Sequence, residues 1–97
     1  MTFEFHPEAR SEFFDAIAHY ESSSKGVGLR FSKEVYATIN RAIASPNSWP
    51  SITDNTRRCL THRFPYSVVY EVRQHDILII AVAHFRREPF YWSDRTQ

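Results

Sequence analysis

Residues 77–83 read Ile-Leu-Ile-Ile-Ala-Val-Ala, and no other stretch constrains the fold of this chain so strongly. The run is far shorter than the roughly 20 apolar residues that span a bilayer. A short apolar run without polar alternation is typical of a strand that is covered on both faces. The sequence therefore predicts a layered fold in which residues 77–83 form a central strand.

An amphipathic helix is predicted to begin at Pro7, because the fixed φ of proline suits the first helical position. Glu8 follows it, and a carboxylate is favourable at the positive end of the helix dipole. Apolar side chains then recur at helical spacing on one face, at Ala9, Phe13, Ile17 and Tyr20. Three consecutive serines at residues 22–24 are expected to end this helix.

A second helix is predicted over residues 29–45, before Pro46. Its apolar side chains form one stripe, at Phe31, Val35, Ile39 and Ala42. The connector at residues 25–28 contains both glycines of the chain, as a tight turn between helices would require. Two helices joined by so few residues are expected to pack antiparallel as a hairpin.

The remaining segments predict strands and a polar loop at residues 45–56. Strands are expected at residues 2–5, 57–62, 67–73 and 77–83. The order β-α-α-β-β-β predicts an α+β fold, in which one helical hairpin packs on a small, mostly antiparallel sheet. A chain of 97 residues is expected to form a single domain over residues 1–97. The pairing direction of the first strand stays open.

One face of the central strand can be covered by the helical hairpin, so a second cover is needed. The aromatic residues near the C-terminus are predicted to supply it: Phe85, Phe90, Tyr91 and Trp92.

The residue types exclude several kinds of site. Five histidines and one cysteine lack the spacing of a metal centre, so neither a metal nor a cofactor is expected. Cys59 has no partner for an intramolecular disulfide and is predicted to be an inert core side chain. Two glycines in a helical connector leave no phosphate-cradling loop. The expected location is the cytoplasm, without contact to a membrane.

Arginines and aromatic rings are concentrated at the end of the chain. The net charge is only +1, yet every cation after residue 45 is an arginine. Residues 84–95 read His-Phe-Arg-Arg-Glu-Pro-Phe-Tyr-Trp-Ser-Asp-Arg. Two interpretations follow: the rings cover the sheet while Arg87 or Arg95 pairs with Glu71 or Asp94, or the segment presents guanidinium groups and rings to a partner.

Three segments carry a resemblance to a known family. Residues 64–72 read Phe-Pro-Tyr-Ser-Val-Val-Tyr-Glu-Val, residues 77–84 continue the central strand to His84, and residues 86–95 contain Arg-Arg, Pro89, Tyr-Trp and Arg95. Together with the helix start and the order of elements, they resemble the ParE branch of the RelE/ParE toxins of type II toxin–antitoxin systems. The resemblance extends over the whole chain.

This resemblance implies a small growth inhibitor that a cognate antitoxin holds inactive. The C-terminal segment of the antitoxin would lie along the helical hairpin and the sheet edge of the toxin. The residues expected to contact it are Phe13, Ile17, Tyr20, Phe31 and Val35.

The superfamily contains two mechanisms. RelE-like members cut messenger RNA on the ribosome, which calls for cations around the scissile phosphate and a proton donor for the leaving oxygen. The matching positions here are Arg58, Leu60, Ser67, Phe85 and Tyr91, of which only Arg58 and Tyr91 suit that chemistry. A register shift of one residue would add Arg86.

ParE-like members resemble one another as inhibitors that bind DNA gyrase and need no active site of their own. The sequence favours this mechanism, with nucleic acid contacted only indirectly through gyrase. The expected target-binding residues are His84, Arg86, Arg87, Tyr91, Trp92 and Arg95. The alternative is a ribosome-dependent endoribonuclease that uses Arg58, Arg86 and Tyr91.

Overall fold

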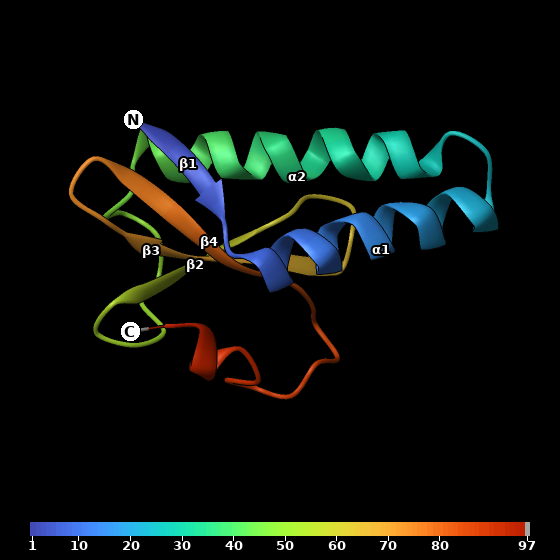
Figure 1. The fold of residues 1–97 in the computed structure, drawn as a ribbon. Coiled ribbons are helices and arrows are strands. Elements are labelled where there is room, and N and C mark those ends of the chain that lie inside the picture. Colours follow the sequence, from blue (N-terminus) through green and yellow to red (C-terminus); the bar gives the residue numbers. More distant parts are fainter. Residues whose placement is uncertain (97) are drawn as a thin grey trace.

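Two helices pack on one face of a four-stranded sheet, and the C-terminal segment packs on the other (Figure 1). The computed structural model describes residues 1–96. The elements are β1 (Thr2–Phe5), α1 (Pro7–Ser23), α2 (Val27–Ala44), β2 (Thr56–Leu60), β3 (Tyr66–Val72), β4 (Asp76–His84) and the short 3-10 helix η1 (Ser93–Arg95). The predicted α+β class and the order β-α-α-β-β-β are confirmed.

The strands form one mixed sheet in the order β1-β4-β3-β2. The predicted central strand is confirmed, because β4 lies between β1 and β3. β1 runs parallel to β4, with Phe3 opposite Ile77, whereas the β2–β3 and β3–β4 pairs are antiparallel. The direction of the first strand, which the sequence left open, is therefore parallel to its neighbour.

A bulge interrupts the pairing of β3 with β4. Val69 lies opposite Ala81 and Tyr70 lies opposite Ile79, so that Ile80 is an extra residue on β4. Consecutive residues of a regular strand point to opposite faces, but Ile80 and Ala81 both pack in the cluster beneath the C-terminal segment. The bulge thus adds apolar surface to the face that the hairpin does not cover.

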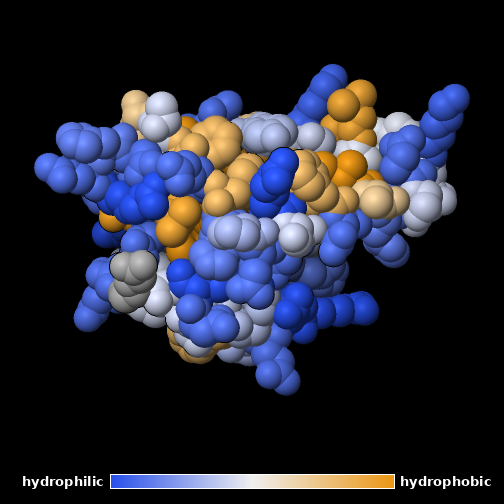
Figure 2. Space-filling model, viewed as in Figure 1, coloured by the Kyte–Doolittle hydropathy of each residue, from blue (hydrophilic) through white to orange (hydrophobic). Residues whose placement is uncertain are grey.

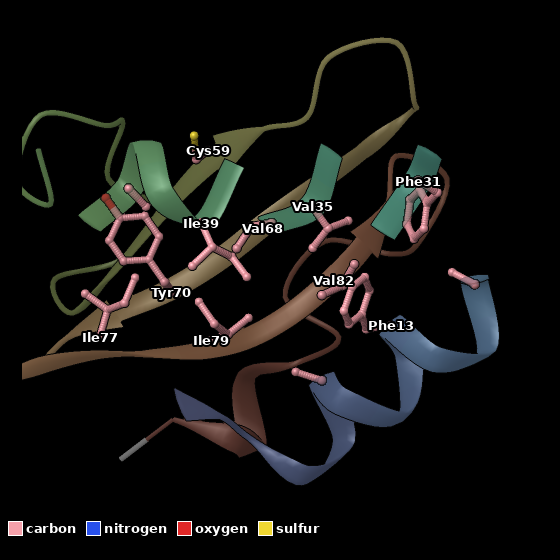
Figure 3. Close-up of a cluster of buried hydrophobic side chains, with 13 residues drawn as sticks. Phe13, Phe31, Val35, Ile39, Cys59, Val68, Tyr70, Ile77, Ile79 and Val82 are labelled. Carbon is pink, nitrogen blue, oxygen red and sulfur yellow. The ribbon is translucent and has the colours of Figure 1, made fainter. Parts of the chain in front are cut away.

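The main core lies between the helical hairpin and the sheet. Figure 3 shows aromatic and aliphatic side chains of the two helices facing those of the strands, with Phe13 and Phe31 at one end and Tyr70 at the other. Tyr70 has no exposed surface and donates its hydroxyl hydrogen to the Pro46 carbonyl, at 2.7 Å. Cys59 is fully buried in the same cluster, as a core side chain would be.

The second glycine has a different role from the one predicted. α2 begins at Val27, two residues earlier than expected, and Gly28 is buried inside it. A Cβ at Gly28 would lie 2.7 Å from the Ile17 carbonyl oxygen and 2.9 Å from the Cβ of Glu21. Gly28 therefore permits the close approach of α1 and α2, whereas Gly26, at φ 87°, makes the turn.

The C-terminal segment covers the second face only in part. Trp92 is 5% exposed and packs with Val69 and Ile80, and the half-buried Tyr91 lies against the same cluster. The prediction was wrong for Phe85 and Phe90, which are 56% and 51% exposed. We call residues 85–96 the tail; in Figure 1 it leaves β4, loops outward and returns to the sheet at η1.

Candidate functional site

A carboxylate on α1 ties the tail to the sheet. Glu12 accepts hydrogen bonds from both terminal nitrogens of Arg95, with Nη1 2.9 Å from Oε1 and Nη2 3.1 Å from Oε2. The Tyr91 hydroxyl donates to Oε2 at 2.7 Å, and the Val82 backbone N–H donates to Oε1 at 3.2 Å. The Glu12 side chain is 16% exposed and that of Arg95 is 8% exposed. Paired, hydrogen-bonded charges of this kind are strong when water is largely excluded.

Tyr91 and Arg87 extend this arrangement toward the surface. The Arg87 guanidinium carbon lies 3.8 Å from the centre of the Tyr91 ring, and Nη1 lies 3.8 Å from Glu12 Oε2. Burial raises the pKa of Tyr91, as do its hydrogen bond to Glu12 and the negative charge there, while Arg87 and Arg95 oppose them. Tyr91 therefore stays a neutral hydrogen-bond donor that links helix α1, the tail and an exposed arginine.

The partner of the tail arginines differs from the one expected. The first interpretation had Arg87 or Arg95 pairing with Glu71 or Asp94, but both pair with Glu12. The signal for this role was present in the helix pattern. Glu12 follows Ala9 by three residues and precedes Ala16 by four, and both alanines are buried, so this carboxylate lies on the buried stripe of α1.

A cavity of about 310 Å³ lies between the tail and the sheet. Its lining combines strand residues, which include Arg58, Ser67 and Ala83, with tail residues from Arg87 to Trp92. The structure thus brings Arg58 and Tyr91 together around one space, which His84 also lines. Arg86 is not part of the lining.

The ribonuclease set is not arranged for acid catalysis. A general acid must reach the leaving oxygen of the substrate, but the Tyr91 hydroxyl is directed to Glu12. Leu60 and Phe85, which occupy two positions where the resemblance expects cations, are 49% and 56% exposed apolar side chains. In this arrangement the cavity can bind a ligand; His84 and Ser67 in its lining carry polar hydrogens, whereas the Tyr91 hydroxyl is engaged by Glu12.

The six predicted target-binding residues divide by exposure. Arg86 and Arg87 are exposed, and His84 and Tyr91 are half-buried. The burial of Trp92 and Arg95 argues against direct contact with a target, because their side chains hold the tail on the sheet.

The predicted antitoxin-binding residues divide in the same way. Phe13, Phe31 and Val35 have no exposed surface, so they cannot contact a partner in this structure, and Ile17 and Tyr20 are half-buried. The prediction placed core residues on the surface, because an amphipathic pattern identifies a buried face without saying what buries it.

Other apolar side chains of the hairpin do reach the surface. The exposed ones are Phe14 at 48%, Leu29 at 59% and Tyr36 at 41%. Figure 2 shows a band of apolar surface across the region of β1 and the two helices. Leu29 and Tyr36 are seven residues apart on α2, so they share one side of that helix.

On the helix side, Glu34 anchors the loop between β2 and β3. It accepts a hydrogen bond from the His62 backbone N–H and another from Arg41 Nη2, at 3.3 Å. Burial alone would raise the pKa of Glu34, but these two donors outweigh burial and hold its pKa below the ordinary value of 4.5. Glu34 therefore acts as an ionised tether between α2 and the sheet.

Within residues 1–96 no three His, Cys, Asp or Glu side chains are grouped closely enough to hold a metal ion. Nor does the described chain contain a helix of the length and apolarity needed to cross a bilayer.

Comparisons with known proteins agree with this architecture. Residues 3–89 match the family model described as the ParE toxin of the type II toxin–antitoxin system parDE. The fold is similar to a chain from a chromosomal ParDE toxin–antitoxin system of P. aeruginosa, with a TM-score of 0.75 and 17% sequence identity. That likeness covers 87% of this chain and 95% of the other. No curated protein matches the sequence.

Proposed function

This chain belongs to the ParE toxin family of type II toxin–antitoxin systems, and on that premise we propose that it inhibits growth by binding DNA gyrase. It acts in the cytoplasm without chemistry of its own, and a cognate antitoxin neutralises it.

The observation that carries this proposal is the anchored tail. Glu12 fixes the tail to the fold, and the tail exposes Arg86, Arg87 and two half-exposed phenylalanines, Phe85 and Phe90. Arginine and aromatic side chains on a pre-ordered segment are typical of binding hot spots, because little conformational entropy is lost when they meet a partner. Such a segment needs no catalytic group.

The ribonuclease alternative has less support. Of the residues it would use, Arg58 lines the cavity, whereas Arg86 lies outside the lining and Tyr91 donates its hydroxyl hydrogen to Glu12. A phosphodiester cleavage site needs several cations and a free proton donor around one phosphate.

The gyrase proposal is tested with purified protein in a DNA supercoiling assay. We expect the chain to inhibit supercoiling and Arg86→Ala to weaken inhibition by about tenfold, since loss of an interfacial arginine commonly has an effect of this size. Arg30→Ala, on the exposed side of α2, is the matched control and should inhibit like the original chain. Cleavage of transcripts in programmed ribosomes, with supercoiling unaffected, would contradict the proposal.

We place the antitoxin on the exposed apolar residues of the hairpin. Tyr36→Ser and Leu29→Ser should each reduce the affinity for the antitoxin, because each removes apolar surface from the same side of α2. Leu60→Ser, on β2, removes a leucine of similar exposure and serves as the control. Isothermal titration with the antitoxin encoded beside the gene measures all three variants. Equal losses in all three would show that the hairpin is not the docking surface.

A further inference from the structure

We propose that the cavity between the tail and the sheet binds one nucleotide of a single-stranded nucleic acid and does not cleave it. This inference goes beyond the inhibition of gyrase and does not depend on it. It also departs from the expectation that nucleic acid is contacted only indirectly.

The space exists because small side chains lie opposite one another in the sheet. Ser67 on β3 pairs in register with Ala83 on β4, and both line the cavity. Trp92 of the tail packs on the cluster that contains Ala83, and Ile52, from the loop before β2, lines the space as well. The resulting volume of about 310 Å³ is at the lower end of the range for small-ligand sites.

Two arginines line this space. Arg58 on β2 is exposed, and its side chain forms no ion pair within residues 1–96. Arg87 of the tail also lines the space, where it is stacked on the Tyr91 ring and lies 3.8 Å from Glu12 Oε2. Glu88 is the one acid among the lining residues, and Arg58 is the cation there that has no ion-pair partner within residues 1–96. Two guanidinium groups that face one space suit a phosphate.

Aromatic rings stand beside these cations. Phe85 and Phe90 both line the cavity, although each is about half exposed. Phe90 has φ 63°, a left-handed backbone conformation that a bulky residue rarely adopts. The ring centre lies 5.9 Å from that of Trp92, so a buried residue supports the strained position. Strain of this kind is retained where the residue is needed in place, and an exposed ring beside cations is a stacking platform for a base.

The combination of arginines and phenylalanine rings around the cavity favours a nucleotide over an acidic segment of a protein. A carboxylate could pair with Arg58 or Arg87, but it would leave the rings in contact with water. A nucleotide of a single strand uses both features, because its phosphate pairs with arginine while its base stacks on phenylalanine. A base held in a duplex is already stacked, so duplexes should bind more weakly. Ribose and deoxyribose strands share this chemistry.

Fluorescence anisotropy tests the proposal directly on the full chain. The probes are fluorescein-labelled oligomers of ten deoxythymidines, ten uridines and a mixed duplex of ten base pairs. We expect at least one single strand to bind about tenfold more tightly than the duplex. Denaturing gels of the same mixtures should show intact oligomers.

Two variants identify the site. Arg58→Ala should weaken binding by about tenfold and reduce the slope of log affinity against log salt by about 0.7, the value for one phosphate contact on a single strand. Phe90→Asn removes the ring and tolerates the left-handed conformation, and it should also weaken binding by about tenfold. Arg30→Ala and Phe14→Ser remove an arginine and a half-exposed phenylalanine that do not line the cavity, and should change little.

Three results would overturn the proposal: equal affinity for duplex and single strands, equal losses in all four variants, or cleaved oligomers. Weaker gyrase inhibition by Arg58→Ala without any oligomer binding would assign the cavity to a protein contact and also reject it. If the oligomers bind as expected and gyrase is unaffected, only the gyrase proposal fails.

Discussion

Within residues 1–96, thirteen buried residues form one apolar cluster on the helix side of the sheet (Figure 3). On the tail side five do, and a single carboxylate supplies much of the attachment. The helix side distributes its stabilisation over many van der Waals contacts and apolar burial. The tail side concentrates it in Glu12, which serves Arg95, Tyr91 and Val82 together. A core that is stabilised by many contacts unfolds as a unit. A segment that is attached mainly through one side chain can detach while the rest of the fold stays intact.

This difference suits a binding protein of the kind proposed. The helix side keeps the fold, and the tail carries the exposed arginines and rings. Local opening free energies differ between parts of a protein, and segments with few buried contacts lie at the low end. The predictions below test whether the two faces are separable in this way.

The largest effect is expected from Phe13→Ala on the helix side. Phe13 is fully buried and its ring contacts those of Phe5, Phe31 and Tyr36, so truncation leaves a cavity. The free energy of unfolding should fall by about 3–5 kcal/mol, measured by urea denaturation with circular dichroism. Phe14→Ala, at the exposed neighbour, should cost less than about 1 kcal/mol. Similar losses from both substitutions would mean that the helix-side core is not what the structure describes.

Glu12→Ala should have the next largest effect, and a more local one. It leaves the buried Arg95 with only the exposed Glu8 as an ionic partner, which should cost about 2–3 kcal/mol. Hydrogen exchange by mass spectrometry should show faster exchange in residues 85–96 and little change in the hairpin. Glu8→Ala is the control, because Glu8 is 61% exposed and lies 3.5 Å from the same arginine. Uniformly faster exchange across the chain would show that the two faces do not separate.

Tyr91→Phe removes one hydrogen bond to Glu12 and should cost about 1–2 kcal/mol at neutral pH. The folded-state pKa of Tyr91 is raised above the ordinary 10.0, so this contribution is complete below pH 10 and is lost as the pH rises beyond it. Urea denaturation between pH 8 and 12 measures the difference between the two proteins. The difference in unfolding free energy between the two proteins should shrink above pH 10. A constant difference would show that Tyr91 ionises over the same pH range in the folded and the unfolded chain.

Glu34→Gln should have the smallest effect, about 1 kcal/mol at neutral pH, because the amide keeps an oxygen that can accept from the His62 N–H. The folded-state pKa of Glu34 is lowered, so its contribution is present above the ordinary pKa of 4.5 and is lost as the pH falls through the folded value. The stability of the variant should therefore decline less steeply between pH 5 and 3. If the original chain and the variant lost stability equally between pH 5 and 3, Glu34 would not act as a charged tether.

Much of the fold could be predicted from local patterns. The apolar run at residues 77–83 predicted a central strand because a strand with water on one face would show polar alternation. Helical spacing predicted both helices, although α2 begins at Val27, two residues before the predicted start. The sequence predicts a turn role for Gly28, because its close contact with Ile17 and Glu21 arises only when the two helices are packed together.

The candidate site was predictable only in part. The tail residues were identified by type, but their division into exposed and buried members was not. Arg95 and Glu12 are 83 residues apart, and no local pattern pairs them. The position of Glu12 on an apolar stripe is the available signal, but a carboxylate is usually solvated, so its residue type alone argues against a buried role.

By itself, the sequence determined the order of elements, the central strand and the cluster of arginines and rings at the end of the chain. These follow from the period of side-chain burial, which is a property of neighbouring residues. Only the tertiary structure decided the parallel pairing of β1, the partner of Arg95, and the cavity beside Arg58. Each of these depends on groups that are distant in the chain, and the free energy that brings them together comes from packing the whole fold.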